Sequence, residues 1–265
     1  MRADGRSPIV VETLAIASVV LGVAAFLVVP TPLVEKLRVA MTGVSAQRPD
    51  HTLALGGVML PLEARMMGIF LGFGLSTTLL WLLGRGRWSG FPPATVGAVL
   101  LLALGAMVAD GLNAFLFDGR LPALYAPSND LRLATGLLAG LALAGFVLPV
   151  VQGAVWRDPL DAPIIASVGE ALFLAAPLAV TYVVARSGAA AALLPLAVLG
   201  PLGVLGSFAL VSAYVLVLAL PRLKAEVARD LVVPAVLGLW LAVVELLLLA
   251  VLRWGMAALG VRWVV

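Results

Sequence analysis

Long apolar stretches alternate with short polar connections along this chain, and that alternation predicts its architecture. Seven stretches each approach the roughly 20 residues that a helix needs to cross a bilayer. They lie at about 9–29, 62–83, 94–116, 131–151, 163–185, 191–219 and 232–254. Their apolar residues are continuous rather than alternating, and a helix satisfies its own backbone hydrogen bonds in lipid. The pattern therefore predicts an all-α, polytopic integral membrane protein with about seven transmembrane helices.

The sixth apolar stretch leaves two arrangements open. It runs from Leu193 to Leu220, which is long for one span, and it contains Pro195 and Pro201. Proline inside a helix removes a backbone hydrogen bond and bends the axis. The stretch is therefore either one tilted, kinked helix or a re-entrant segment followed by a span.

The order of the stretches divides the chain into four parts. Residues 1–30 form the first transmembrane helix, and residues 31–61 form an extramembrane connection. Residues 62–151 form a three-helix core, and residues 152–265 contain three further spans. Within the connection, Glu35, Lys36 and Arg38 stand among apolar residues, which predicts either an amphipathic helix on the membrane surface or an ordinary loop helix.

Composition excludes a soluble protein and several kinds of chemistry. Apolar residues make up 63% of the chain, and there is no cysteine and one histidine, His51. Without thiols or a second imidazole, we expect no disulfide, no metal site and no cofactor. The formal charge of +3 is spread over connections, so no nucleic-acid partner is expected. The expected partners are the lipid bilayer and either another membrane protein or a second copy of this chain.

The basic residues favour one orientation in the cell (inner or cytoplasmic) membrane. Lys and Arg are equally numerous on the two predicted faces. The tight clusters, however, are Arg85 with Arg87 and the group Arg222, Lys224 and Arg229, and both lie on the face of the N-terminus. Because short cytoplasmic connections are rich in Lys and Arg, this distribution favours an N-terminus inside the cell.

Polar residues near the ends of three spans form a candidate site. Because successive spans reverse direction, the start of the second span, the end of the third and the start of the fourth lie at the same membrane face. We expect Arg65 to pair with Asp110, and Arg132 to pair with Glu63 or Asp130, since an unpaired charge near hydrocarbon is costly. Charged side chains at span ends also reach water, so a purely structural or interfacial role is the alternative. The predicted cluster comprises Glu63, Arg65, Asp110, Asn113, Asn129, Asp130 and Arg132, with Ser128 or Asn129 capping the fourth helix.

Two further carboxylates stand alone within apolar stretches. Glu170 is in the fifth stretch and Glu245 in the seventh, with no Lys or Arg nearby in sequence. We expect each to be protonated or paired across helices. Proton-coupled transport uses such groups, but a hydrogen bond to Ser212 or Tyr214 would serve packing equally well.

Small residues at four-residue spacing predict close contacts between helices. Gly68 and Gly72 lie on one face of the second span, and Gly136 and Gly140 on one face of the fourth. This spacing lets helix backbones approach closely in lipid, either within the chain or in a dimer.

Residues 40–150 resemble a bacterial and archaeal membrane family catalogued as domain of unknown function 2085. The similar segments are Ser-Ala-Gln-Arg-Pro at 45–49, Leu-Pro-Leu-Glu-Ala-Arg at 60–65, Asp-Gly-Leu-Asn at 110–113 and Ser-Asn-Asp-Leu-Arg at 128–132. The family has Cys-His and Cys-x-x-Cys where this chain has Ser45, Ala46, Glu63 and Met66, so a thiol-based metal or redox site is absent here. Gln47 is retained with Arg65, Asp110, Asn129 and Arg132 and joins the candidate cluster. The family's function is unknown, so the resemblance implies no activity.

Three functions remain open from the sequence. The leading one is an accessory or structural subunit, or a scaffold, packed by the polar cluster at one membrane face. The second is a small proton- or cation-coupled transporter that uses Glu170 and Glu245, although no internal repeat is evident. The third is a lipid-modifying enzyme that uses Glu63, Asp110 and Arg65. No recognised catalytic motif supports an enzyme, and the sequence leans against one.

Overall fold

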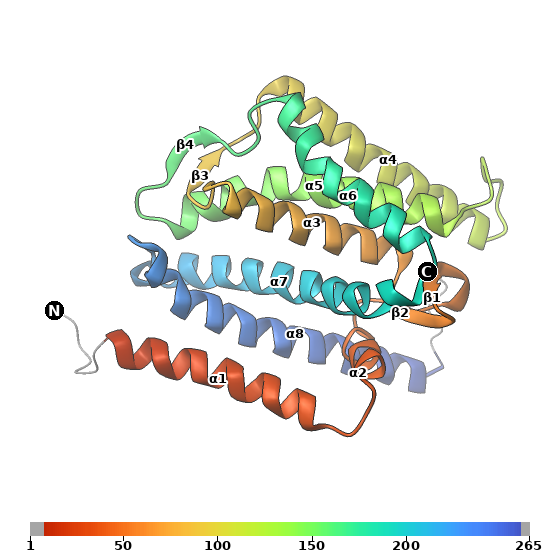
Figure 1. Cartoon of the computed structure of the whole chain (residues 1–265), viewed down its shortest axis with the longest axis horizontal. Helices are drawn as coiled ribbons and strands as arrows, with labels where there is room; N and C mark the ends of the chain where they lie inside the picture. The colour runs from red at the N-terminus through yellow and green to blue at the C-terminus, as the bar shows by residue number, and fades with distance from the viewer. Residues whose placement is uncertain (1–7, 261–265) are drawn as a thin grey trace.

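Eight helices make up most of the protein in the computed structural model, which describes residues 8–260 (Figure 1). The helices are α1 (Pro8–Val28), α2 (Leu33–Ala40), α3 (Ala64–Leu82), α4 (Ala94–Asp118), α5 (Asn129–Val155), α6 (Val168–Arg186), α7 (Leu193–Ala219) and α8 (Val232–Ala258). The strands are β1 (Thr52–Leu55), β2 (Val58–Glu63), β3 (Trp88–Gly90) and β4 (Leu160–Pro163), and the 3₁₀ turns are η1 (Pro49–His51), η2 (Ala190–Ala192), η3 (Pro221–Leu223) and η4 (Ala228–Leu231).

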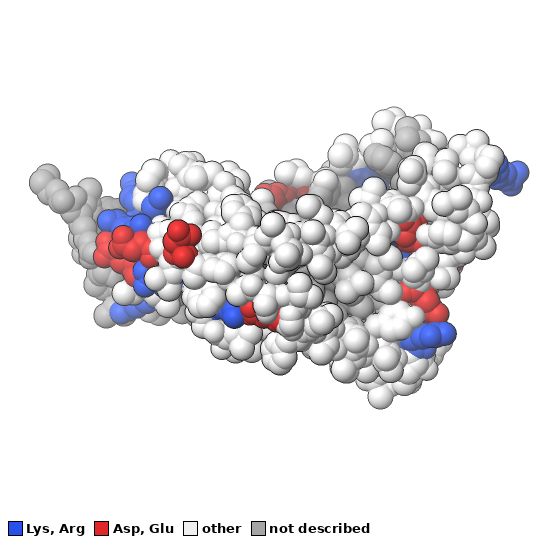
Figure 2. All heavy atoms as spheres, turned by 90° about the horizontal axis from the view of Figure 1, so that it is seen from above, with Lys and Arg blue, Asp and Glu red and all other residues white. Residues whose placement is uncertain are grey.

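Seven of these helices, all but α2, are long and apolar enough to cross a membrane. They coincide with the seven predicted stretches, which confirms the all-α, polytopic class. The helices run largely along the longest axis of the molecule. On the face seen in Figure 2, charged side chains form groups toward both ends of that axis, with a few nearer the middle, and uncharged atoms make up most of the surface between them. This distribution is expected when the middle of the molecule faces hydrocarbon and the ends face water.

The centre of the bundle is the contact between α3 and α5. An added Cβ at Gly68 would lie 2.6 Å from the Leu133 carbonyl oxygen, and one at Gly136 would lie 2.6 Å from the Arg65 carbonyl oxygen. Gly72 and Gly140 are packed equally closely against the partner backbone. The four predicted packing glycines therefore lie in one interface within the chain, where only glycine permits this approach. By contrast, α1 lies at the edge of the bundle beside α8 (Figure 1).

The sixth span is one continuous helix. Leu193–Ala219 is helical throughout, with Pro201 inside it. Pro195 lies in its first turn, where no backbone N–H needs a partner within the helix. Of the two arrangements left open by the sequence, the structure has the single helix.

The helix that carries Glu170 begins later than the sequence suggested. We expected the fifth span from about residue 163, but α6 starts at Val168, and Glu170 is in its first turn. The Ser167 hydroxyl accepts a hydrogen bond from the Glu170 N–H, and the Glu170 carboxylate accepts one from the Ala166 N–H. Glu170 therefore lies in the capping turn at the start of α6 and not in the middle of a span.

A β-hairpin between α2 and α3 is the main element that the sequence analysis did not predict. β1 and β2 pair antiparallel around Gly56 and Gly57, which have φ values of +56° and +81°. Positive φ at both turn positions is the geometry of a tight hairpin and suits glycine. β2 leads directly into α3, so the hairpin fixes the residues that precede the second span. A second pair of strands, β3 and β4, is parallel. It joins the connections that follow the C-terminal ends of α3 and α5, at the other end of these helices from the hairpin.

Candidate functional site

The predicted ion pair between α3 and α4 is present. Arg65 Nη2 lies 2.6 Å from Asp110 Oδ2, and Asp110 is only 2% exposed. The second carboxylate oxygen accepts a hydrogen bond of 2.9 Å from the Tyr125 hydroxyl. Burial, followed by the bond to Asp110, raises the pKa of Tyr125, so the phenol remains a donor at neutral pH. Both oxygens of a buried carboxylate are thereby engaged.

Asn113 holds the connection between α4 and α5 against the end of α4. Its side-chain oxygen accepts from the Leu124 N–H at 2.8 Å, and its amide donates to the Tyr125 carbonyl at 3.0 Å. These bonds position Tyr125 for its contact with Asp110. Asn113 is therefore part of the cluster through the connection rather than through a charged partner.

Glu63 is paired with an arginine that comes from the segment before the hairpin. Arg48 contacts Glu63 through its backbone N–H at 3.0 Å and its Nε at 3.4 Å, and it reaches Asp118 through Nη1 at 3.3 Å. The Glu63 N–H donates to the Ser45 hydroxyl at 3.0 Å. One arginine thus links the loop, the end of β2 and the end of α4.

His51 lies between two arginines. Arg48 Nη2 contacts ring atom Nδ1, and Arg132 Nη2 lies 3.2 Å from Nε2. Nε2 is also 3.3 Å from Asp50 Oδ2 and 3.4 Å from Asp118 Oδ2. Arg48 and Arg132 can only donate, so each ring nitrogen faces a guanidinium donor, and a neutral ring accepts from only one of the two. Burial, with the charges of Arg132 and Arg48, lowers the pKa of His51 from its ordinary value of 6.5, so the ring is neutral at pH 7.

The predicted partners of Arg132 were wrong. Its guanidinium donates to Asn129 Oδ1 at 3.0 Å and otherwise contacts His51, whereas Glu63 is held by Arg48. Asp130 pairs instead with Arg186 at the end of α6, at 3.2 Å and largely exposed. The side chain of Asp130 therefore points away from the cluster. Arg132 is only 5% exposed, and among the described residues no carboxylate lies within ion-pair distance of it.

The amides of Gln47 and Asn129 tie the segment before the hairpin to the helices. Gln47 Nε2 donates to the carbonyls of Arg38 at 2.6 Å and Pro61 at 2.9 Å. Asn129 Nδ2 donates to the Asp50 carbonyl at 3.1 Å. Gln47 itself has a φ of +56°, which is unusual for a residue other than glycine. The segment is thus held in a defined path over the ends of α3 and α5.

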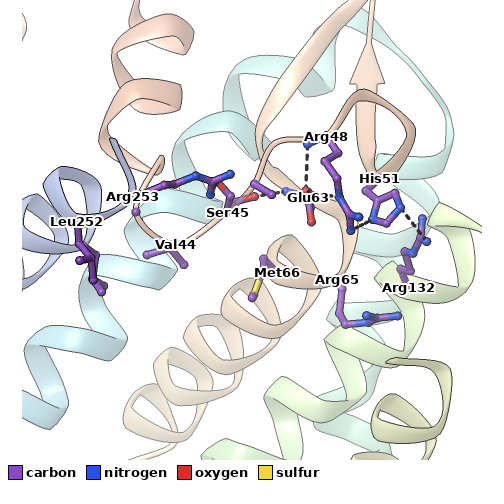
Figure 3. A pocket seen from close by; sticks show the side chains of 13 residues that line it. Val44, Ser45, Arg48, His51, Glu63, Arg65, Met66, Arg132, Leu252 and Arg253 are labelled. Carbon is purple, nitrogen blue, oxygen red and sulfur yellow. Dashed lines mark hydrogen bonds and ion pairs between the residues drawn. The ribbon is translucent and has the colours of Figure 1, made fainter. Parts of the chain in front are cut away.

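These side chains border a cavity of about 350 Å³ that also reaches α8 (Figure 3). Its polar wall contains Arg48, Arg65, Arg132 and Arg253, with Glu63 and His51. Arg253 extends from α8 toward the loop and donates to the carbonyls of Thr42 at 3.0 Å and Ser45 at 2.6 Å. Its apolar wall includes Val44, Met66, Leu249 and Leu252. The cavity therefore combines several guanidinium groups with an apolar surface at one end of the bundle.

A second cavity of about 230 Å³ lies at the other end of the bundle and differs in chemistry. Its lining is almost wholly apolar and includes Trp81, Trp156 and Leu210. Gln152 is its one amide, and no charged residue lines it. The arginine-lined cavity is consequently the better candidate for polar recognition.

The two carboxylates singled out in the apolar stretches lie outside this cluster. Glu170 forms an ion pair with Arg85 near the opposite end of the bundle. Glu245 accepts a hydrogen bond of 2.9 Å from the Ser212 hydroxyl, one of the two partners expected from the sequence. Each carboxylate therefore has a partner on another element.

Five residues of the site were not predicted from the sequence to belong to the cluster: Arg48, His51, Asp118, Tyr125 and Arg253. Four of them lie in connections or at a helix terminus, where periodicity gives no direction for a side chain. Arg253 offered a signal, because it is a charge within an otherwise apolar stretch. In the described part of the chain, no three His, Cys, Asp or Glu side chains are grouped as metal ligands.

The fold and this site define a multi-pass integral membrane protein with a polar cluster at one end of its helices. Residues 45–146 match the model of a family described as "Predicted membrane protein (DUF2085)". This match agrees with the resemblance seen in the sequence motifs, and it covers the hairpin, α3, α4 and most of α5. No curated protein and no solved structure matches the chain.

Proposed function

We propose that this chain is an accessory or scaffold protein of the cell membrane, whose polar cluster fastens its helices at one membrane face. The observation that carries the proposal is the Arg65–Asp110 pair, which joins α3 to α4 with both Asp110 oxygens engaged. The N-terminus is proposed to be inside the cell. The proposed partners are the bilayer and either another membrane protein or a second copy of the chain.

The bonding of the carboxylates supports this function over the two alternatives. A transporter needs Glu170 and Glu245 to exchange protons or cations, but Glu170 caps α6 and is paired with Arg85, and Glu245 is bonded to Ser212. A lipid-modifying enzyme needs an acid or base available to its substrate. Glu63 and Asp110 are instead bonded to Arg48 and Arg65.

A charge exchange between Arg65 and Asp110 tests the structural role. Arg65→Asp or Asp110→Arg alone leaves like charges together in a buried place, and we expect a loss of about 3–5 kcal/mol of stability. The double variant restores opposite charges and should recover part of that loss, although the Tyr125 bond to Asp110 is not restored. The measurement is the thermal unfolding midpoint of the protein purified in detergent.

The exposed pair of Arg186 and Asp130 provides the matched control at the same end of the bundle. Its side chains are 63% and 43% exposed, so the corresponding single changes should have little effect. Single changes at Arg65 and Asp110 that leave the midpoint unaltered, or a double variant that is no better than the singles, would contradict the proposed role.

A further inference from the structure

The guanidinium of Arg132 is buried, and no carboxylate of the described residues lies within ion-pair distance of it. Its residue is 5% exposed, and it donates one hydrogen bond, to Asn129 Oδ1. The contact with His51 does not compensate it, because a neutral imidazole carries no charge and accepts from only one of the two arginines beside it. A buried charge without a partner is costly, and an arginine has five donors to satisfy. Arg132 therefore has donors free for an anion.

Arg253 repeats this pattern from the other side of the same cavity. Its contacts are two backbone carbonyls, and no carboxylate of the described chain is within ion-pair distance. Figure 3 shows it reaching in from α8, with Arg48, Arg65 and Arg132 on the other side. The carboxylates near the cavity are already used, since Glu63 and Asp118 neutralise Arg48 and Asp110 neutralises Arg65. The four arginines stand against the three carboxylates Glu63, Asp110 and Asp118, so the cavity carries a net charge of +1, and neither Arg132 nor Arg253 has a carboxylate of its own within ion-pair distance.

The apolar residues of the arginine-lined cavity indicate that the rest of its ligand is apolar. Leu249, Leu252, Val44 and Met66 line the cavity beside the arginines, and Leu252 is 59% exposed on the outer surface of α8. A cavity of about 350 Å³ falls within the range of small-molecule sites, roughly 300–1,000 Å³. Guanidinium groups recognise phosphate oxygens through paired hydrogen bonds. The arrangement suits a phosphate group attached to an apolar chain.

We propose that this cavity binds a phosphate-bearing anion through Arg132 and Arg253, with the chain of an amphiphile such as an anionic phospholipid lying on the α8 wall. The shared chemistry is the phosphate, which a lipid headgroup or a soluble phosphate ester can supply. Glu63 stays bonded to Arg48 and faces the cavity as an acceptor for a ligand hydroxyl group. Nothing in this proposal depends on the scaffold function.

The test compares two sources of phosphate on the full-length protein in dodecyl maltoside. One arm adds phosphatidylglycerol, with phosphatidylcholine as the net-neutral control, and the other adds inorganic phosphate. Binding is followed by native mass spectrometry for lipid and by the shift in unfolding midpoint for phosphate. We expect phosphatidylglycerol to bind more tightly than phosphatidylcholine, and Arg253→Gln to weaken that binding by about tenfold.

Two further variants keep the test independent of a folding defect at Arg132. Met66→Trp fills the cavity and retains every arginine, so it should weaken binding as Arg253→Gln does. Arg186→Gln removes an exposed arginine at the same end, outside the cavity, and should leave binding unchanged. If inorganic phosphate alone saturates the site and is lost with Arg253→Gln, the ligand is a soluble phosphate. Equal binding of the two lipids with no phosphate effect, or an equal loss in Arg186→Gln, would overturn the proposal.

Discussion

His51 is the residue through which acidification is expected to act on the cluster. The residue is 5% exposed, its ring lies between Arg48 and Arg132, and its pKa is below the ordinary value of 6.5. As pH falls through about 6.5, the unfolded chain takes up a proton at His51 while the folded chain does not. The folded state is therefore fully stable above pH 6.5 with respect to this group and loses stability progressively below it.

The His51 prediction is tested by unfolding the protein between about pH 7.5 and pH 5.5. The His51→Gln variant serves as the comparison, because glutamine retains an acceptor for Arg48 and does not titrate. The wild-type protein should lose stability more steeply than the variant across this range. Parallel pH profiles would show that His51 does not carry the dependence.

The Arg65–Asp110 ion pair was predictable from the sequence, whereas the contact between Arg132 and His51 was not, for a physical reason. Arg65 and Asp110 are both on helices whose direction and span ends could be read from hydropathy, so their meeting was predictable. Arg132 contacts His51, which lies in the 3₁₀ turn η1 just before the hairpin, where the sequence has no periodic pattern. Glu170 was misplaced because an apolar stretch does not mark where its helix begins, whereas the Ser167 cap does.

At the scale of elements, the contact between α3 and α5 is set by backbone approach rather than by side-chain size. We predict that Gly72→Ala will destabilise the protein by about 1–3 kcal/mol, because the added methyl group would overlap the Leu137 carbonyl oxygen. Gly105→Ala in α4 is the matched control. A Cβ there meets nothing within 4 Å, and alanine favours a helix, so stability should be unchanged or slightly higher.

The measurement for the glycine pair is again the unfolding midpoint in detergent. A Gly72→Ala midpoint equal to that of Gly105→Ala would mean that α3 and α5 can separate at little cost, against the interface described here. The glycine contacts also exclude one form of dimerisation. Gly68 and Gly136 already pack against each other's helices within one chain, so these glycines are not free to join two copies.

The elements differ in how far the sequence predicts them. Span length and continuity of apolar residues are enough to find the seven long helices, including α7 despite Pro201. The hairpin was missed although Gly56-Gly57 between short apolar runs is a hairpin signal. Its strands are only four and six residues long, and the end of β2 overlaps the stretch at 62–83 that was predicted as a span, so the two runs were not recognised as separate strands.

For the whole molecule, orientation in the membrane decides which leaflet the arginine-lined cavity faces. The basic clusters Arg85 with Arg87 and Arg222 with Lys224 are at the end opposite the cavity, together with the start of α1. If these clusters are cytoplasmic, the hairpin, the cavity and the α4–α5 connection are on the external side. We therefore predict that the cavity draws its ligand from the outer face of the membrane.

The absence of cysteine from the chain makes this prediction directly measurable. Leu124→Cys places a single thiol in the α4–α5 connection, where the residue is 93% exposed, and Asp158→Cys places one in the exposed connection at the other end of α5. A membrane-impermeant maleimide should label Leu124→Cys in intact cells and Asp158→Cys only after permeabilisation. The reverse result would put the N-terminus outside and the cavity in the cytoplasmic leaflet. Labelling of both in intact cells would contradict a span between them, because α5 would then not cross the membrane.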